Sequence, residues 1–290
     1  MILRDLIKYL ELFAPLAWQE EWDNAGLQVG NLEREIKTIV LALDADFRAL
    51  EYCVEVGADL LITHHPMIFS PIYSINSDNA KEDLILKFIE NKISVYSMHT
   101  NIDKVPWGTN YALAEELGLE ESILEEPLFP EFNKEFKDIS SEFKEQFKQK
   151  ISGFVSIIEI ESSRRELIDR IREVFRVEPE LNFEEDARVG TIGLSGGSFD
   201  REWLEKAAQA GIDTLIVGEM KYHDKVDARE LGIATIALGH DVSENPVLSI
   251  FDYLCKSYNS YAKSQYEEAS SSITEFDILH FPRIEYDKFN

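Results

Sequence analysis

Short apolar runs alternate along the first half of the chain with segments whose apolar residues recur at helical spacing. The apolar runs are "IKTIVLAL" (36–43), "DLLITH" (59–64) and "ISVYSMH" (93–99), and the helical segments between them cover 46–58 and 79–92. This order of strand, helix, strand, helix, strand predicts parallel strands, because parallel neighbours need a crossover connection. Strands that are apolar almost throughout also indicate a sheet that is covered on both faces.

The same alternation returns in the last third of the chain. Strand patterns cover 188–197, 213–219 and 233–240, and helical patterns cover 200–211 and 223–232. The chain therefore contains two α/β halves.

The segment between the halves has a different pattern. A stretch rich in Phe, Lys and Glu (125–150) precedes a strand-like run, "FVSIIEI" (154–160). Its Phe residues are more typical of a core than of a binding surface. A helix is predicted after Ser163, because Glu166 three residues later completes a capping-box pattern.

These patterns predict an α/β protein of two lobes, with largely parallel or mixed sheets and a short inserted middle segment. The predicted domains are an N-terminal α/β lobe at 1–121, an inserted or bridging subdomain at 122–187 and a C-terminal α/β lobe at 188–290. A chain of 290 residues is long enough for one large domain or two smaller ones.

Charge and cysteine content exclude several classes of protein. The chain has 29 basic and 55 acidic residues, a formal net charge of −26, so it repels nucleic-acid phosphates and no direct nucleic-acid binding is expected. Its two cysteines, Cys53 and Cys255, form no CxxC pattern, which argues against a disulfide framework or a thiolate zinc site. No basic segment leads into an unbroken apolar one, and no apolar run reaches the ~20 residues that cross a bilayer. We expect a cytoplasmic protein that does not bind membranes.

Four of the six histidines lie where predicted strands end. His64 and His65 follow one strand, while His99 and His240 end two others. In open α/β sheets, ligand sites gather outside the carboxyl ends of the strands. Carboxylates follow two of these histidines at a spacing of four residues, Asp103 after His99 and Glu244 after His240.

This pattern points to a centre with two metal ions. Residues i and i+4 share one face of a helix, so His240 and Glu244 are predicted to reach one ion or a pair. Successive side chains diverge on an extended strand, so His64 and His65 are expected to serve two different ions. Imidazoles supply nitrogen ligands, carboxylates can bridge two ions, and a water between the ions is the expected nucleophile. A single histidine at a strand end is usually a packed residue, and only the convergence of several favours a site.

Five motifs in order along both halves carry a resemblance to a known family. They are "WDNAGLQVG" (22–30), "LITHHPMIF" (61–69), "SMHTNID" (97–103), "GEMKYHD" (218–224) and "GHDVSE" (239–244). Together they resemble the Nif-three-like dinuclear metal protein family, whose members are often labelled GTP cyclohydrolase 1 type 2 homologs. The resemblance implies that two metal ions bind to His64, His65, Asp103, His240 and Glu244. It also implies a site between the two α/β lobes and a ring-shaped homohexamer.

Other residues of these motifs have weaker assignments. We consider His99 and His223 as residues that orient a ligand or contact substrate, although either could simply cap an element. Glu219 is a candidate general base, although an acidic residue also suits a helix start. In "WDNAG", Asp23 could lie near the site, whereas Asn24 is more typical of a turn. The glycines of "LSGGS" (194–198) fit close strand-to-helix packing better than a phosphate site.

Two classes of function remain open. The first is a dinuclear metal-dependent hydrolase that acts on a small, nucleotide-like substrate and holds two divalent ions per chain, Zn, Fe or Mn. The second is a metal-binding regulatory or scaffold protein without turnover. Five protein ligands for two ions leave coordination positions open, which favours catalysis.

Overall fold

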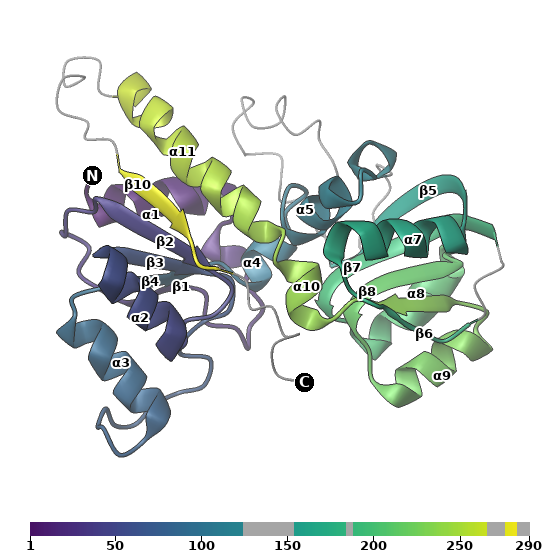
Figure 1. Ribbon diagram of the computed structural model, residues 1–290, viewed down its shortest axis with the longest axis horizontal. Helices are drawn as coiled ribbons and strands as arrows, with labels where there is room; N and C mark the ends of the chain where they lie inside the picture. The colour runs from purple at the N-terminus through teal and green to yellow at the C-terminus, as the bar shows by residue number, and fades with distance from the viewer. Residues whose placement is uncertain (124–153, 184–187, 266–275, 283–290) are drawn as a thin grey trace. The chain divides into compact units, whose positions relative to one another are not determined.

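Two compact units make up the part of the chain that the computed structural model describes, which is 1–123, 154–183, 188–265 and 276–282 (Figure 1). The first unit consists of Met1–Asn101 and Phe251–Asn290, and the second of Ile102–Ile250. Each unit contains one mixed five-stranded sheet, so the α/β class with two sheets predicted from the sequence is confirmed. The Phe-rich stretch at 125–150 lies outside the described residues.

The sheet of the first unit has the order β1-β4-β3-β2-β10. Its strands are β1 (Gly26–Val29), β2 (Thr38–Ala42), β3 (Leu60–Thr63), β4 (Ser94–Ser97) and β10 (Asp277–His280). Four of them run parallel, and β1 is antiparallel to β4 at one edge. The helices of this unit are α1 (Leu3–Phe13), α2 (Phe47–Val56) and α3 (Ala80–Glu90), together with most of α11 (Val247–Gln265).

Both faces of this sheet are covered, as its apolar strands predict. Val40, Leu61 and Val95 pack in one cluster with side chains of α2 and α3. Their strand neighbours Ile39 and Ile62 point to the other face and are also fully buried. The carboxyl ends of β2, β3 and β4 therefore lie side by side at the same end of a buried sheet.

The sheet of the second unit has the order β5-β7-β8-β9-β6. Its strands are β5 (Ser156–Ser163), β6 (Glu180–Leu181), β7 (Arg188–Ser198), β8 (Thr214–Glu219) and β9 (Ala234–Ala237). The three central strands are parallel, and β5 and β6 are antiparallel at the edges. The helices are α5 (Thr109–Glu116), α7 (Arg164–Phe175), α8 (Leu204–Gln209), α9 (Tyr222–Glu230) and α10 (His240–Glu244).

Two apolar clusters cover the two faces of this second sheet. Ile192 and Ile216 pack with α5 and α7, whereas Leu215 and Val217 pack with α8 and α9. The remaining described helices are α4 (Thr100–Asp103) and the 3-10 turns Leu16–Trp18, Glu120–Ser122 and Arg201–Trp203. The chain passes between the units within α4 and within α11.

The predicted capping box is present at the start of α7. The Ser163 hydroxyl accepts a hydrogen bond from the Glu166 backbone N–H at 3.2 Å, and the Glu166 carboxylate accepts one from the Ser163 backbone N–H at 2.9 Å. Two N–H groups that helix geometry leaves unpaired are thereby satisfied, which fixes where α7 begins.

The two units follow other boundaries than the predicted domains 1–121, 122–187 and 188–290. Strand β5 comes from the middle segment but pairs with β7, and β10 comes from the C-terminal lobe but pairs with β2. These pairings join segments that are distant in sequence, which local patterns do not record. As independently folding pieces, the three predicted domains stay a prediction.

None of the helices in the described part of the chain is long and apolar enough to cross a membrane.

Candidate metal centre

Three histidines lie together where two neighbouring parallel strands of the first unit end. His64 and His65 follow β3, and His99 follows β4 by one residue. Their ring centroids are 5.0, 5.3 and 5.7 Å apart, and one ligand nitrogen from each lies within 4.8 Å of the others. We call these three residues the histidine cluster.

The expectation that His64 and His65 diverge is wrong. Strand β3 ends at Thr63, before either histidine, and the backbone turns there. The Thr63 hydroxyl donates to the His65 carbonyl at 2.8 Å, and the His65 N–H donates to the Leu43 carbonyl at 2.9 Å. Because the pair lies beyond the extended strand, the alternation of strand side chains no longer applies to it.

The Nδ1 atom of each ring in the histidine cluster is held by an oxygen. The pairs are His64 with the Met98 carbonyl at 2.9 Å, His65 with the Asp44 carboxylate at 2.9 Å, and His99 with the Asp23 carboxylate at 2.7 Å. A carbonyl or carboxylate oxygen only accepts, so Nδ1 carries the proton in the neutral rings. The Nε2 lone pairs are then the ones that can bind a metal ion, an arrangement usual for metal-binding histidines.

Asp23 is the most constrained of these hydrogen-bond acceptors. Its side chain is fully buried and accepts hydrogen bonds from His99, from the Asn24 N–H and from the N–H and hydroxyl of Thr100. Burial raises the pKa of Asp23, but the hydrogen bonds from His99 and Thr100 outweigh it and lower the pKa to about 2. Asp23 is therefore a fixed anion that orients the His99 ring.

Two exposed aromatic rings border the histidine cluster. The centroids of Trp22 and Phe69 lie 6.2 and 6.3 Å from that of His99, and 5.9 Å from each other. Both side chains are exposed. They form an apolar rim beside the imidazoles.

The second unit places one imidazole between two carboxylates. His240 begins α10 three residues after the end of β9, and its Nε2 lies 3.2 Å from Glu244 Oε2, so the two side chains share a helix face as their spacing predicts. Its Nδ1 lies 3.1 Å from Glu219 Oε1, at the end of β8. Glu219 thus makes the contact to His240 that Asp23 makes to His99. Glu244 is buried, whereas Glu219 is exposed.

Glycines of "LSGGS" make room for this pair. A Cβ atom at Gly197 would lie 2.2 Å from Glu244 Oε1 and 3.7 Å from His240 Nε2, and the residue has a positive φ of 70°. The Gly197 N–H donates to the Ser243 hydroxyl at 2.9 Å. A Cβ at Gly218 would lie 2.4 Å from the Gly197 carbonyl oxygen. The glycines therefore serve close packing of β7, β8 and α10, the alternative that the sequence favoured.

The other residues singled out from the sequence have these positions. Asp103 ends α4, and its Oδ1 accepts a hydrogen bond from the Thr109 hydroxyl at 2.5 Å. His223 lies on the exposed side of α9 with its ring 5.3 Å from that of Tyr222. Asn24 donates to the Ile68 carbonyl at 2.6 Å, a contact between distant segments, and its turn role stays a prediction.

Sequence reasoning missed Asp44 and Met98. Asp44 lies two residues after β2, which runs parallel to β3 and β4. A carboxylate just beyond the carboxyl end of a parallel strand was the signal that could have identified it. Met98 contributes a backbone carbonyl. Every residue has one, so the residue type gives no signal in the sequence.

The sequence profile of the Duf34/NIF3 family, NGG1p interacting factor 3, matches residues 1–271 of the chain. The chain belongs to the Duf34/NIF3 family. A GTP cyclohydrolase 1 type 2 homolog from Clostridium acetobutylicum is 32% identical over 248 residues, covering 84% of this chain and 85% of the relative. A relative with the same name from Methanocaldococcus jannaschii is 31% identical over 245 residues, with 84% and 90% covered.

Solved structures agree with the fold. A Bacillus cereus protein related to NIF3 superposes with a TM-score of 0.75 at 19% identity, and reduced HcgD from Methanocaldococcus jannaschii with a TM-score of 0.71 at 26% identity. Each comparison covers 98% of both chains.

The side chains present fit divalent transition metals. Imidazole nitrogen with carboxylate oxygen is a donor set that suits Zn, Fe or Mn. The cysteines take no part, because Cys53 and Cys255 are buried and burial raises the pKa of Cys53 to about 12. Neither cysteine belongs to the groups of His and Glu residues that could hold a metal ion in the described part of the chain.

Proposed function

We propose that this protein holds two divalent metal ions, Zn, Fe or Mn, and is a hydrolase of a small substrate. The proposed ligands are those predicted from the sequence, His64, His65, Asp103, His240 and Glu244. The name shared by the relatives, GTP cyclohydrolase 1 type 2 homolog, makes a nucleotide-like substrate the first class to test.

One observation carries the proposal. All four histidines at these strand ends have Nδ1 beside an oxygen, and three of the four oxygens belong to carboxylates, Asp44, Asp23 and Glu219. A hydrogen bond at Nδ1 fixes the orientation of the imidazole ring and raises the basicity of Nε2. Metal-binding histidines usually have such a bond, so its presence at all four histidines supports metal binding.

We also revise the roles proposed for His99, Glu219 and His223. We propose His99 as a further ligand, because its ring belongs to the histidine cluster and Asp23 orients it as Asp44 orients His65. Glu219 then acts by positioning His240 rather than as a general base. His223 keeps only its predicted role in contacting substrate.

The chain's own residues bind and orient, and the ions supply the Lewis acidity that hydrolysis of an unactivated bond needs. The exposed rings of Trp22 and Phe69 offer an apolar surface to a substrate beside His99. A site between the two units, a homohexameric ring, a cytoplasmic location and the absence of nucleic-acid binding remain predictions from the sequence.

The test is a substrate screen that includes GTP and other small phosphoesters, amidines and ring C–N compounds. It compares metal-loaded wild type with His64→Ala/His65→Ala, and with His280→Ala as a control that removes an exposed histidine from β10. We expect turnover in wild type and in the control, and loss of turnover in the double variant. If wild type binds metal but turns over no substrate faster than the double variant does, the metal-binding regulatory or scaffold protein is favoured instead.

A further inference from the structure

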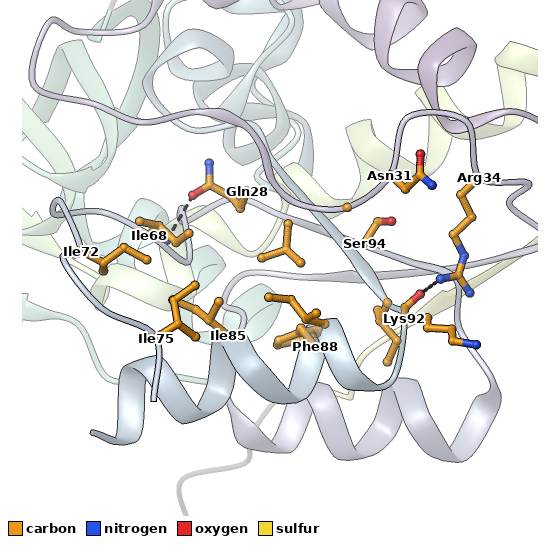
Figure 2. Close-up of a pocket in the computed structure, with 14 residues that line it drawn as sticks. Gln28, Asn31, Arg34, Ile68, Ile72, Ile75, Ile85, Phe88, Lys92 and Ser94 are labelled. Carbon is orange, nitrogen blue, oxygen red and sulfur yellow. Dashed lines mark hydrogen bonds between the residues drawn. The ribbon is translucent and has the colours of Figure 1, made fainter. Parts of the chain in front are cut away.

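A pocket of about 600 Å³ lies within the first unit, between β1 with the loop that follows it and helix α3 (Figure 2). Its volume falls within the roughly 300–1,000 Å³ typical of small-molecule sites. None of the histidines in the cluster lines it, so it is a separate feature of the unit.

The two ends of the pocket differ in chemistry, as Figure 2 shows. Four of the six isoleucines that line the pocket lie at one end: Ile68, Ile72, Ile75 and Ile85. Arg34, Asn31 and Lys92 lie at the opposite end, with Phe88 of α3 between the two groups. A molecule that fills this space needs an apolar body and one polar end.

The polar end of the pocket is basic, although the chain as a whole is acidic. The lining contains two basic residues and no Asp or Glu, although acidic residues outnumber basic ones by 55 to 29 overall. The Arg34 guanidinium donates to the Lys92 carbonyl and lies 3.2 Å from Asp59, which holds it at the end of the pocket. The Lys92 ammonium forms no salt bridge with any residue that the structure describes.

Hydrogen bonds join the segments that border the pocket. The Ile68 N–H donates to the Gln28 side chain at 3.1 Å, which ties the isoleucine-bearing segment to β1 (Figure 2). The Asn24 side chain donates to the Ile68 carbonyl at 2.6 Å. Segments that are held in this way need less ordering when a ligand binds, which favours affinity.

We propose that this pocket binds a carboxylate with a medium-length aliphatic chain. The chain lies among the isoleucines, where burial of apolar surface stabilises it, and the carboxylate faces Lys92 and Arg34. A protein with a net charge of −26 repels anions in general, so saturable binding of a carboxylate requires a local site of this kind.

Titration calorimetry of the whole chain with dodecanoate, kept below its micelle concentration, tests the proposal, and neutral 1-dodecanol measures the contribution of charge. Ile89→Glu places a carboxylate on the exposed pocket side of α3; its control is Val54→Glu, an equally exposed position near the end of α2. Lys92→Gln removes a charge from the polar end, and Lys37→Gln removes one elsewhere in the unit. Circular dichroism confirms that each variant is folded.

We expect one dodecanoate per chain, bound more tightly than dodecanol. Ile89→Glu should weaken dodecanoate at least about tenfold and Val54→Glu less than about twofold. Lys92→Gln should weaken dodecanoate about threefold or more, leave dodecanol unchanged and differ from Lys37→Gln. Absence of saturable binding, equal loss in Ile89→Glu and Val54→Glu, or equal affinity for dodecanol would each overturn the proposal. An oligomer that forms without ligand and dissociates in Ile89→Glu would also overturn the proposal, because a second copy of the chain would then cover the pocket.

Discussion

The central strands are parallel in both units, but the residues just beyond their ends carry different side chains. In the first unit three imidazoles lie together, and the oxygens that hold them contact Nδ1. In the second unit a single imidazole, His240, lies between the carboxylates of Glu219 and Glu244. The first set offers neutral nitrogens and the second adds negative charge. Parallel strands thus supply the positions, and the residues just beyond each strand determine the chemistry.

The largest effect should come from the charge of the second unit. Glu244→Gln keeps the shape of a buried side chain but removes its negative charge. We expect divalent metal affinity to fall by more than about 100-fold, beyond the 10- to 100-fold cost of losing a supporting hydrogen bond. Competition with a chelating dye measures it, with the surface change Glu230→Gln as control. An affinity equal to that of the control would remove Glu244 from the ligand set.

A large effect is also expected at Gly197, which touches no metal in our account. The Cβ of Gly197→Ala would displace the Glu244 carboxylate, and we expect metal affinity to fall roughly 10- to 100-fold. Gly211→Ala is the matched control, because Gly211 has a similar φ of 75° but no atom within 4 Å of an added Cβ. Both variants share the left-handed strain of about 1–2 kcal/mol, so equal metal affinities would contradict the role assigned to Gly197.

In the first unit, Asp23→Asn should weaken metal binding about tenfold, because the amide supports the His99 ring less well than a carboxylate. The free energy of unfolding of the metal-free chain should also drop, by about 1–3 kcal/mol, since buried donors lose a charged acceptor. Urea unfolding and dye competition measure the two effects. A stability loss with unchanged metal affinity would leave Asp23 a purely structural residue.

The smallest effect should follow Asp44→Asn. Asp44 holds His65 as Asp23 holds His99, but its side chain is 61% exposed whereas that of Asp23 is fully buried. Water can replace part of an exposed contact, so we expect less than about a threefold loss of metal affinity. If this loss exceeded that of Asp23→Asn in the same dye competition, burial would not be what separates the two carboxylates.

Much of the fold could be predicted from the sequence because its signals are local. The apolar runs, the helical spacing and the capping box at Ser163 each depend on neighbours within a few residues, and the structure contains the corresponding elements. The pairing of β10 with β2 depends instead on contacts across more than 200 residues of chain, which periodicity cannot record. The short strand β1 was not predicted from the sequence.

The candidate site divides in the same way. The spacing of His240 and Glu244 predicted a shared helix face, because helix geometry is local. The convergence of His64 with His65 was missed, since it depends on where β3 ends. The contacts of Asp44 and of the Met98 carbonyl arise only when separate strands lie side by side.

The central claim, that both sets of residues hold metal, is tested most directly by metal stoichiometry. The chain is purified without chelators, titrated with Zn, Mn or ferrous ion, and measured by elemental analysis alongside His64→Ala/His65→Ala and Glu244→Gln. We predict two ions per chain in wild type, and at least one ion fewer in each variant. A folded wild type that binds no transition metal, or variants that retain both ions, would contradict the account.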